Sequence, residues 1–100
     1  MAQIIALGKK TVAAVGTLVQ LTTTEGVHAW AVRASEDNTG KIYIGLAGFT
    51  TADYVGIFWE LNPGETFSSV SSGLNDINPS KVYLDTETSG NFLTGVLQVR

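Results

Sequence analysis

The sequence predicts a single all-β domain, folded as an antiparallel β-sandwich or a small barrel. Three observations favour this fold class. Apolar and polar residues alternate with a period of two in several segments, turn-forming Gly, Pro, Asn and Ser recur at intervals of about ten residues, and no segment has a convincing helical period. Because 100 residues is the size of one domain, residues 1–100 are expected to share one core, with residues 1–8 as a candidate N-terminal arm.

The N-terminal part is expected to form short strands. Residues 3–7 are an apolar segment that does not alternate cleanly, which suits a strand covered on both faces or an arm laid against another subunit. Two strands are predicted within 11–15 and 18–22, with Gly16 as the pivot between them. A polar loop then ends at the conformationally permissive Gly26.

The stretch from His28 to Gly45 is predicted to be a central β-hairpin. Its polar linker contains Asn38 and Gly40, two residues that tolerate positive φ and would let the chain reverse. The apolar residues of each arm share one side, namely Trp30, Val32 and Ala34 in the first arm and Ile42 and Ile44 in the second.

The remaining elements follow from turn chemistry. Residues 46–60 are expected to be a loop followed by a strand, since Val55-Gly56-Ile57 makes a poor helix. Pro63-Gly64 meets the requirement of a type II turn. Beyond it we predict a strand at 66–70, a connection at 71–80 anchored by Leu74 and Ile77, and strands at 81–85 and 92–99, the last with a bulge at Gly95.

The expected core collects the inward-facing apolar residues of these strands. The segment 81–85 repeats the residue pattern of 41–45, so its apolar residues should also point inward. The core is predicted to contain Trp30, Val32, Ala34, Ile42, Ile44, Phe67, Val82, Leu84, Leu97 and Val99.

The composition leaves few charges for the outside of the molecule. Charged residues make up 15% of the chain against about 25% in typical soluble domains, while 44% is apolar and the mean hydropathy is +0.18. A Thr, Ser and Gly surface would account for this, and so would apolar surface covered by other subunits. The two interpretations are compatible.

Charge and cysteine content exclude several classes of partner. The net charge is −3 and the basic residues are scattered apart from Lys9-Lys10, so neither nucleic acid nor an anionic membrane surface is expected as a main partner.

The first residues lack the features of a signal peptide, and no apolar run approaches the ~20 residues that cross a bilayer. Without cysteine, stability cannot come from disulfides, and folding in a reducing cytosol is the simplest expectation.

No set of residues supports a reaction. The chain has one histidine, His28, and no cysteine, so nucleophile–base arrangements and the usual structural zinc sites are not expected. Asp85-Thr86-Glu87 lacks the ligand spacing of a calcium loop, and the glycine-containing segments lack the spacing of a phosphate-binding loop. Nothing in the sequence singles out two of the acidic residues as a pair of catalytic carboxylates of the kind that glycoside hydrolysis requires. We therefore expect no enzyme activity, no metal and no cofactor.

The one sequence feature that could indicate a binding function is a cluster of aromatic residues within 46–60. It admits three interpretations: rings that fill the core under a long loop, a subunit or partner contact, or a platform that stacks on a sugar ring. Together with the N-terminal arm, it supplies the interface candidates Ile4, Ile5, Leu7, Phe49, Tyr54, Phe58, Trp59 and Glu60.

The order of several segments resembles the small all-β virion proteins of tailed bacteriophages, which are capsid decoration (cement), head-fibre or tail accessory proteins. The resemblance covers about three-quarters of the chain, as a pattern without a diagnostic motif. It is carried by the segments Gly16–Thr22, Asn38–Gly45, Leu61–Glu65 and Lys81–Asp85. In that family the Asn-Thr-Gly and Pro-Gly-Glu elements are hairpin turns, whereas the aromatic residues of 46–60 depart from its pattern.

The resemblance implies a homotrimer that is made in the host cytoplasm and seated on the virion, where it bridges subunits of the major capsid protein. Weak apolar contacts and strand addition by the arm at residues 2–7 would then give multivalent binding. On this hypothesis, deletion of residues 1–7 should abolish capsid binding and leave the fold intact. The alternative hypothesis is a carbohydrate-binding module of a tail or fibre, with Tyr54 and Trp59 as the stacking residues.

Overall fold

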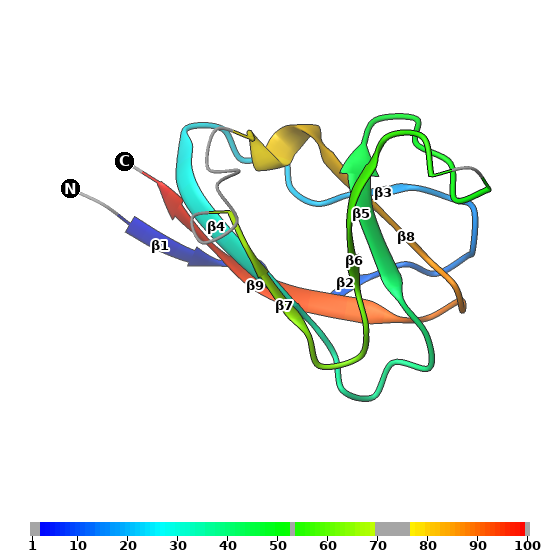
Figure 1. Ribbon diagram of the computed structural model, residues 1–100. Helices are drawn as coiled ribbons and strands as arrows, with labels where there is room; N and C mark the ends of the chain where they lie inside the picture. The colour runs from blue at the N-terminus through cyan, green and yellow to red at the C-terminus, as the bar shows by residue number, and fades with distance from the viewer. Residues whose placement is uncertain (1–2, 53, 70–76, 100) are drawn as a thin grey trace.

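The computed structural model is a sandwich of two antiparallel β-sheets, and it describes residues 3–52, 54–69 and 77–99 (Figure 1). Sheet A has the strand order β1-β9-β4-β7, and β2 also pairs with β9. Sheet B has the order β3-β8-β5-β6. The all-β sandwich expected from the sequence is confirmed.

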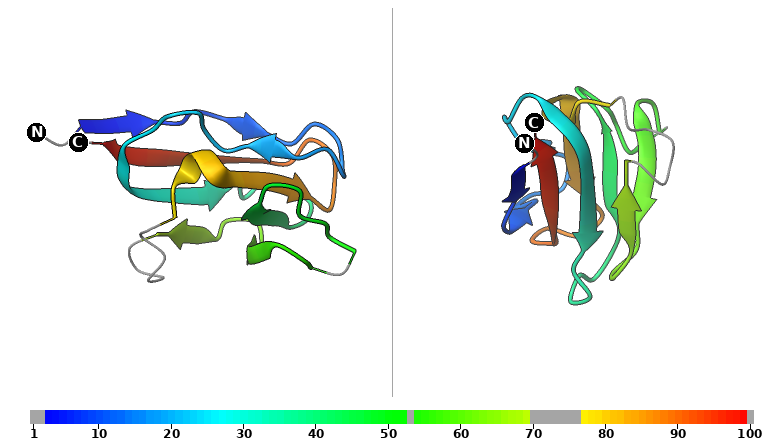
Figure 2. Two further views of the ribbon diagram at one scale, coloured as in Figure 1. Left: turned by 90° about the horizontal axis from the view of Figure 1, so that it is seen from above. Right: turned by 90° about the vertical axis from the view of Figure 1, so that its left-hand side faces the viewer.

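The strands are mostly short. Those of sheet A are β1 (Gln3–Ala6), β2 (Lys10–Thr11), β4 (Val27–Ala34), β7 (Thr66–Ser68) and β9 (Phe92–Val99). Those of sheet B are β3 (Val19–Gln20), β5 (Ile42–Leu46), β6 (Ile57–Leu61) and β8 (Val82–Thr86). One turn of 3-10 helix, η1 (Pro79–Lys81), leads into β8. Figure 2 shows the two layers and the start of β1 beside the end of β9.

The predicted central hairpin is wrong. Its two arms are β4 and β5, and they lie in different sheets: β4 pairs with β7 and β9, whereas β5 pairs with β6 and β8. Alternation identifies which face of a strand is buried but not which strand lies beside it, and both arms bury one face in the same core. The linker 35–41 therefore crosses from one layer to the other.

Asn38 and Gly40, the residues expected to reverse the chain direction in this linker, do not adopt the predicted turn conformation. Neither Asn38 nor Gly40 has a positive φ. The buried Asn38 side chain instead pairs with the backbone of Phe92, since Nδ2 donates to the Phe92 carbonyl at 2.9 Å and Oδ1 accepts from the Phe92 N–H at 3.0 Å. The side chain thus replaces a strand partner at the point where the chain changes sheet.

The Pro-Gly turn forms as predicted, but it does not close a hairpin. Gly64 has φ +85°, and the Glu65 N–H donates to the Asn62 carbonyl at 3.0 Å. The strands on either side, β6 and β7, belong to different sheets, so this turn also crosses the sandwich. The hairpin role implied by the family resemblance is therefore wrong for both turns.

The core lies between the sheets and matches most of the prediction. Nine of the ten predicted residues are buried, and Val99, at the end of β9, is half-buried. The prediction missed four further residues of this core: Val12, Leu21, Leu61 and Leu93. As expected from the repeated pattern, Ile44 and Leu84 face each other across β5 and β8, and both are buried.

Gly95 is not a bulge, because β9 keeps its register with β4 at the Val32–Gly95 pair. The glycine is required by close packing: a Cβ there would lie 2.5 Å from the Ala31 carbonyl oxygen. The connection predicted at 71–80 falls partly outside the described residues, and Leu74 with it. Ile77 does pack against the core as expected, and its carbonyl accepts from Trp30 Nε1 at 3.0 Å.

Candidate binding surfaces

The outer face of sheet A carries exposed apolar side chains. Strand register places Ile4 and Ala6 of β1, Val96 of β9 and Ala31 of β4 on this side, because their neighbours in sequence point into the core. Ile4 is 66% exposed and Val96 is 44% exposed. This set of four residues is called the sheet A face below.

A shallow apolar depression of about 410 Å³ lies on this face. It is lined by Ala6, Gly8, Ala31, Val32, Arg33, Thr66, Thr94, Gly95 and Val96. The depression forms where β1 has ended and β2 has not begun, at Gly8 with φ +72°. Small side chains on three adjacent strands thus leave room for apolar groups of a partner.

The edge strand β1 borders this face and has no feature that blocks a further strand. Its residues include no charge, proline or bulge, the devices that usually protect sheet edges. The other edges are better protected: β2 and β3 have two residues each, β7 has three, and β6 carries a bulge and Glu60. Among the edges of the described chain, β1 is the one open to strand addition.

Three of the predicted interface residues are covered by other parts of the chain. Ile5 and Leu7 are half-buried and pack against the core, as their alternation with Ile4 and Ala6 requires. Phe49 is buried on the outer face of sheet B, where it packs over Gly45 and Gly56 and anchors the loop 47–56. These side chains hold the fold and do not form an accessible surface.

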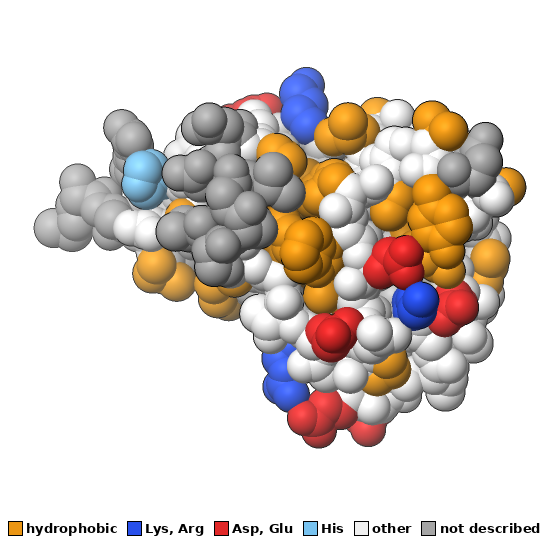
Figure 3. Space-filling model, viewed as in Figure 1, with side chains coloured by type: hydrophobic (Ala, Val, Ile, Leu, Met, Phe, Trp, Pro, Cys, Tyr) orange, Lys and Arg blue, Asp and Glu red, His pale blue; other side chains and the backbone are white. Residues whose placement is uncertain are grey.

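Phe58 and Trp59 both pack against Phe67. Ile44 pairs with Trp59 and Gly45 pairs with Ile57, so Phe58 is the extra residue of a β-bulge. The bulge interrupts the alternation, and both rings therefore reach Phe67, with centroid distances of 5.9 and 5.0 Å. Figure 3 shows hydrophobic side chains gathered between β6 and β7. Phe58 belongs to the margin of the core, while Trp59 remains 42% exposed.

Tyr54 lies on the other side of sheet B from Trp59. Its ring meets the ring of Tyr43 edge to face at 6.2 Å, and Tyr43 alternates with the buried Ile44, the strand partner of Trp59. Tyr54 is also the one described residue other than glycine with a positive φ, at +62°. The structure therefore does not bring Tyr54 and Trp59 together as one stacking platform.

The outer face of sheet B is charged where that of sheet A is apolar. Lys41 Nζ lies 3.0 Å from Glu60 Oε1, and this hydrogen bond raises the pKa of Lys41. Burial raises the pKa of the Tyr43 hydroxyl on the same face, with a smaller contribution from the Glu87 carboxylate. Glu60, an interface candidate from the sequence, is thus paired within the chain.

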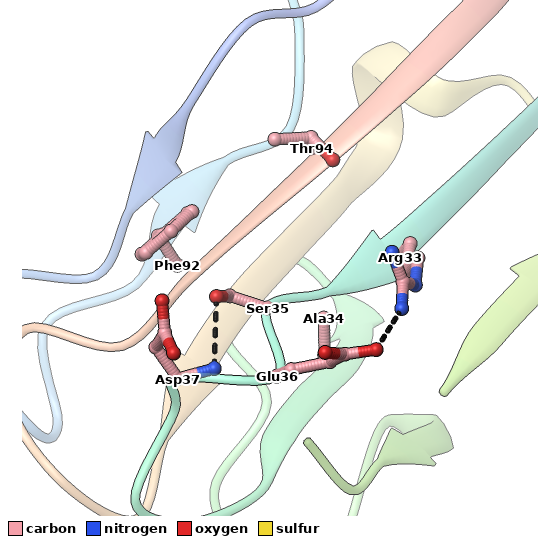
Figure 4. Close-up of a pocket in the computed structure, with 7 residues that line it drawn as sticks. All are labelled: Arg33, Ala34, Ser35, Glu36, Asp37, Phe92 and Thr94. Carbon is pink, nitrogen blue, oxygen red and sulfur yellow. Dashed lines mark hydrogen bonds and ion pairs between the residues drawn. The ribbon is translucent and has the colours of Figure 1, made fainter. Parts of the chain in front are cut away.

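A polar pocket of about 280 Å³ adjoins the apolar depression, and Arg33 and Thr94 line both. Its other lining residues are Ala34, Ser35, Glu36, Asp37 and Phe92. Figure 4 shows Arg33 paired with Glu36, at 2.6 Å, and the Asp37 N–H donating to Ser35 Oγ, at 3.1 Å. The sequence prediction missed this pocket, because its residues meet only after β4 and β9 pair.

The described residues contain no group of three or more His, Asp or Glu side chains that could hold a metal ion. Within the same residues, no helix has the length and apolar character needed to cross a membrane. Comparison of the chain with known protein families, with curated proteins and with solved structures found no match.

Proposed function

We propose that the chain is a non-enzymatic structural protein of a tailed bacteriophage virion: a decoration or cement protein that binds the assembled shell of major capsid protein as an oligomer, in the simplest case a homotrimer. The sheet A face is the contact surface. The observation that carries the proposal is that this face combines exposed apolar side chains with an open edge strand.

The charge distribution supports the choice of this face. On sheet A the nearby charges lie toward one end, where Arg33 pairs with Glu36 and Lys9 Nζ lies 4.3 Å from the centroid of the Phe92 ring. A partner that covers Ile4 and Val96 would therefore remove apolar surface from water without stripping water from an ion pair. On sheet B a partner would have to cover the charges of Lys41 and Glu60.

The open edge supplies the second contribution. An extended segment of a capsid subunit that pairs with β1 would satisfy backbone N–H and C=O groups on both strands. A four-residue strand gives few such bonds, so each contact is weak. Several copies seated on a shell bind far more tightly than one, because each further contact forms at a high effective concentration.

The structure also changes how the arm should be tested. Deletion of residues 1–7 would remove Ile5 and Leu7 from the core and β1 from β9, so lost binding could reflect lost folding. The substitutions Ile4→Glu and Val96→Glu act on exposed side chains and place a charge on the sheet A face. Val55→Glu is the matched control, because Val55 is 65% exposed and lies in the loop 47–56.

The experiment is co-sedimentation with shells assembled from the major capsid protein encoded in the same genome, after light scattering has counted the subunits. Wild type and Val55→Glu should sediment with the shells. Ile4→Glu and Val96→Glu should each bind at least about tenfold more weakly, which corresponds to roughly 1.4 kcal/mol. Circular dichroism checks that each variant is folded. Failure of the wild type to bind, or equal binding by the Ile4→Glu/Val96→Glu double variant, would contradict the proposal.

A further inference from the structure

The polar pocket beside the sheet A face has the composition of a ligand site. It brings together an aromatic ring from Phe92, a carboxylate from Asp37, hydroxyls from Ser35 and Thr94, and the guanidinium of Arg33. In Figure 4 Asp37 extends its carboxylate on the Phe92 side of the pocket, and Arg33 lies on the opposite side. Hydrogen-bond donors, acceptors and an apolar platform thus surround one small space.

The pocket is held in shape before any ligand arrives. The loop 35–38 is joined to the backbone of Phe92 by three hydrogen bonds. The Asn38 side chain donates one and accepts one, and the Ser35 N–H donates to the Phe92 carbonyl at 3.1 Å. Inside the loop, the Asn38 N–H donates to the Ser35 carbonyl at 3.2 Å. Because the loop and the backbone of Phe92 are already fixed relative to each other, a ligand would not have to order the loop on binding.

The charges in and around the pocket balance. Arg33 pairs with Glu36, and Lys9 adds a positive charge next to the pocket, with its Nζ 4.3 Å from the centroid of the Phe92 ring. Lys9 is not a lining residue, so the lining itself carries one positive charge, on Arg33, and two negative charges, on Glu36 and Asp37. A site with many polar groups and a small negative charge in its lining suits a neutral ligand rather than an anion.

We propose that this pocket binds a neutral sugar ring. The apolar face of a pyranose would pack on the Phe92 ring, Asp37 would accept hydrogen bonds from two neighbouring sugar hydroxyls, and Arg33 and the hydroxyl side chains would contact the remaining oxygens. The volume of about 280 Å³ lies at the lower end of small-molecule pockets and suits one sugar unit. This inference does not rest on the proposed capsid function, since it concerns a different pocket and ligand.

The test is a nuclear magnetic resonance titration of the ¹⁵N-labelled chain with the methyl glycosides of glucose, galactose, mannose and N-acetylglucosamine. For a ligand of about a dozen heavy atoms we expect a Kd on the order of 1–10 mM. The amide shifts of at least one of the four titrations should centre on the loop 35–38 and Phe92. Methyl glucoside 6-phosphate, which adds negative charge beside Glu36 and Asp37, should bind more weakly than its uncharged parent.

Two variants decide the role of the pocket. Asp37→Asn removes a charged acceptor from an exposed loop, and Phe92→Leu keeps apolar bulk but removes the ring; each should weaken binding at least about fivefold. Trp59→Ala is the matched control and should bind as the wild type does. No shift with any of the four sugars at about 100 mM, shifts centred on Trp59 or Tyr54, or unchanged affinity of Asp37→Asn would overturn the proposal.

Discussion

Replacement of Gly95 by alanine should destabilise the chain more than its single added methyl group suggests. The new Cβ would lie 2.5 Å from the Ala31 carbonyl oxygen, 2.9 Å from Val32 Cγ1 and 3.0 Å from Leu7 Cδ1. The side chains of Val32 and Leu7 can move by rotation. The Ala31 oxygen cannot, because β4 is paired with β9 on one side and with β7 on the other.

The size of the effect follows from these contacts. Overpacking of a core by one methyl group costs about 1–3 kcal/mol, and a backbone contact that cannot relax belongs in the upper part of that range. The φ of Gly95 is not in the left-handed region, so alanine adds no backbone strain there. We expect a loss of about 2–3 kcal/mol, which lowers the Tm of a domain of this size by about 8–24 °C.

Urea unfolding followed by tryptophan fluorescence measures this loss, with two controls. Thr94→Ala, at the neighbouring exposed position, should change the free energy of unfolding by less than about 0.5 kcal/mol. Gly16→Ala, where φ is +86° and a Cβ would have open space, should cost only the strain of about 1–2 kcal/mol. The reasoning fails if Gly95→Ala is as stable as the wild type, or if Leu7→Ala restores its stability, because the Ala31 oxygen would then not be the obstacle.

Two further predictions concern polar groups that join separate parts of the chain. Asn38→Ala should lower the free energy of unfolding by about 1–3 kcal/mol in urea titrations, since it leaves the Phe92 N–H without its partner and removes one of two hydrogen bonds to the Phe92 carbonyl, while Asp37→Asn in the same loop should be nearly neutral. Hydrogen bonds from Asn78 and Ser80 lower the pKa of Glu25, so its contribution to stability should be complete above the ordinary glutamate pKa of about 4.3 and disappear as the pH falls through the lowered value. Thermal unfolding of wild type and Glu25→Gln across that range checks the sign, and curves that run parallel would refute it.

The fold class and the inward-facing residues could be predicted from the sequence because both depend on local alternation. Trp30, Val32, Ile42 and Ile44 are buried as their spacing requires. Strand partners could not be predicted in this way, since β4 and β5 both bury one face in the same core and the linker between them fits either a hairpin or a crossover. The missed core residue Val12 follows β2, a two-residue strand too short to show a period.

The candidate surfaces were harder to predict, for a related reason. Ile4 was singled out because it belongs to an apolar run, and it is indeed exposed. Val96 gave a weaker signal: it is an apolar residue at the outward position between Gly95 and Leu97, where alternation in a monomer would favour a polar side chain. The pocket around Phe92 left no local signal, because Arg33 and Phe92 are far apart in sequence and meet only through the pairing of β4 with β9.

The two proposed surfaces can be separated even though they adjoin. Ile4 and Val96 are absent from the lining of the polar pocket, and Asp37 and Phe92 are absent from the lining of the apolar depression. Substitutions at the first pair should therefore weaken shell binding and leave the sugar titration unchanged, while substitutions at the second pair should do the reverse. Arg33 lines both, so Arg33→Ala is the one substitution expected to affect both measurements. If every variant instead weakened both activities together, the two surfaces would act as a single site, and the separate roles assigned to them would have to be abandoned.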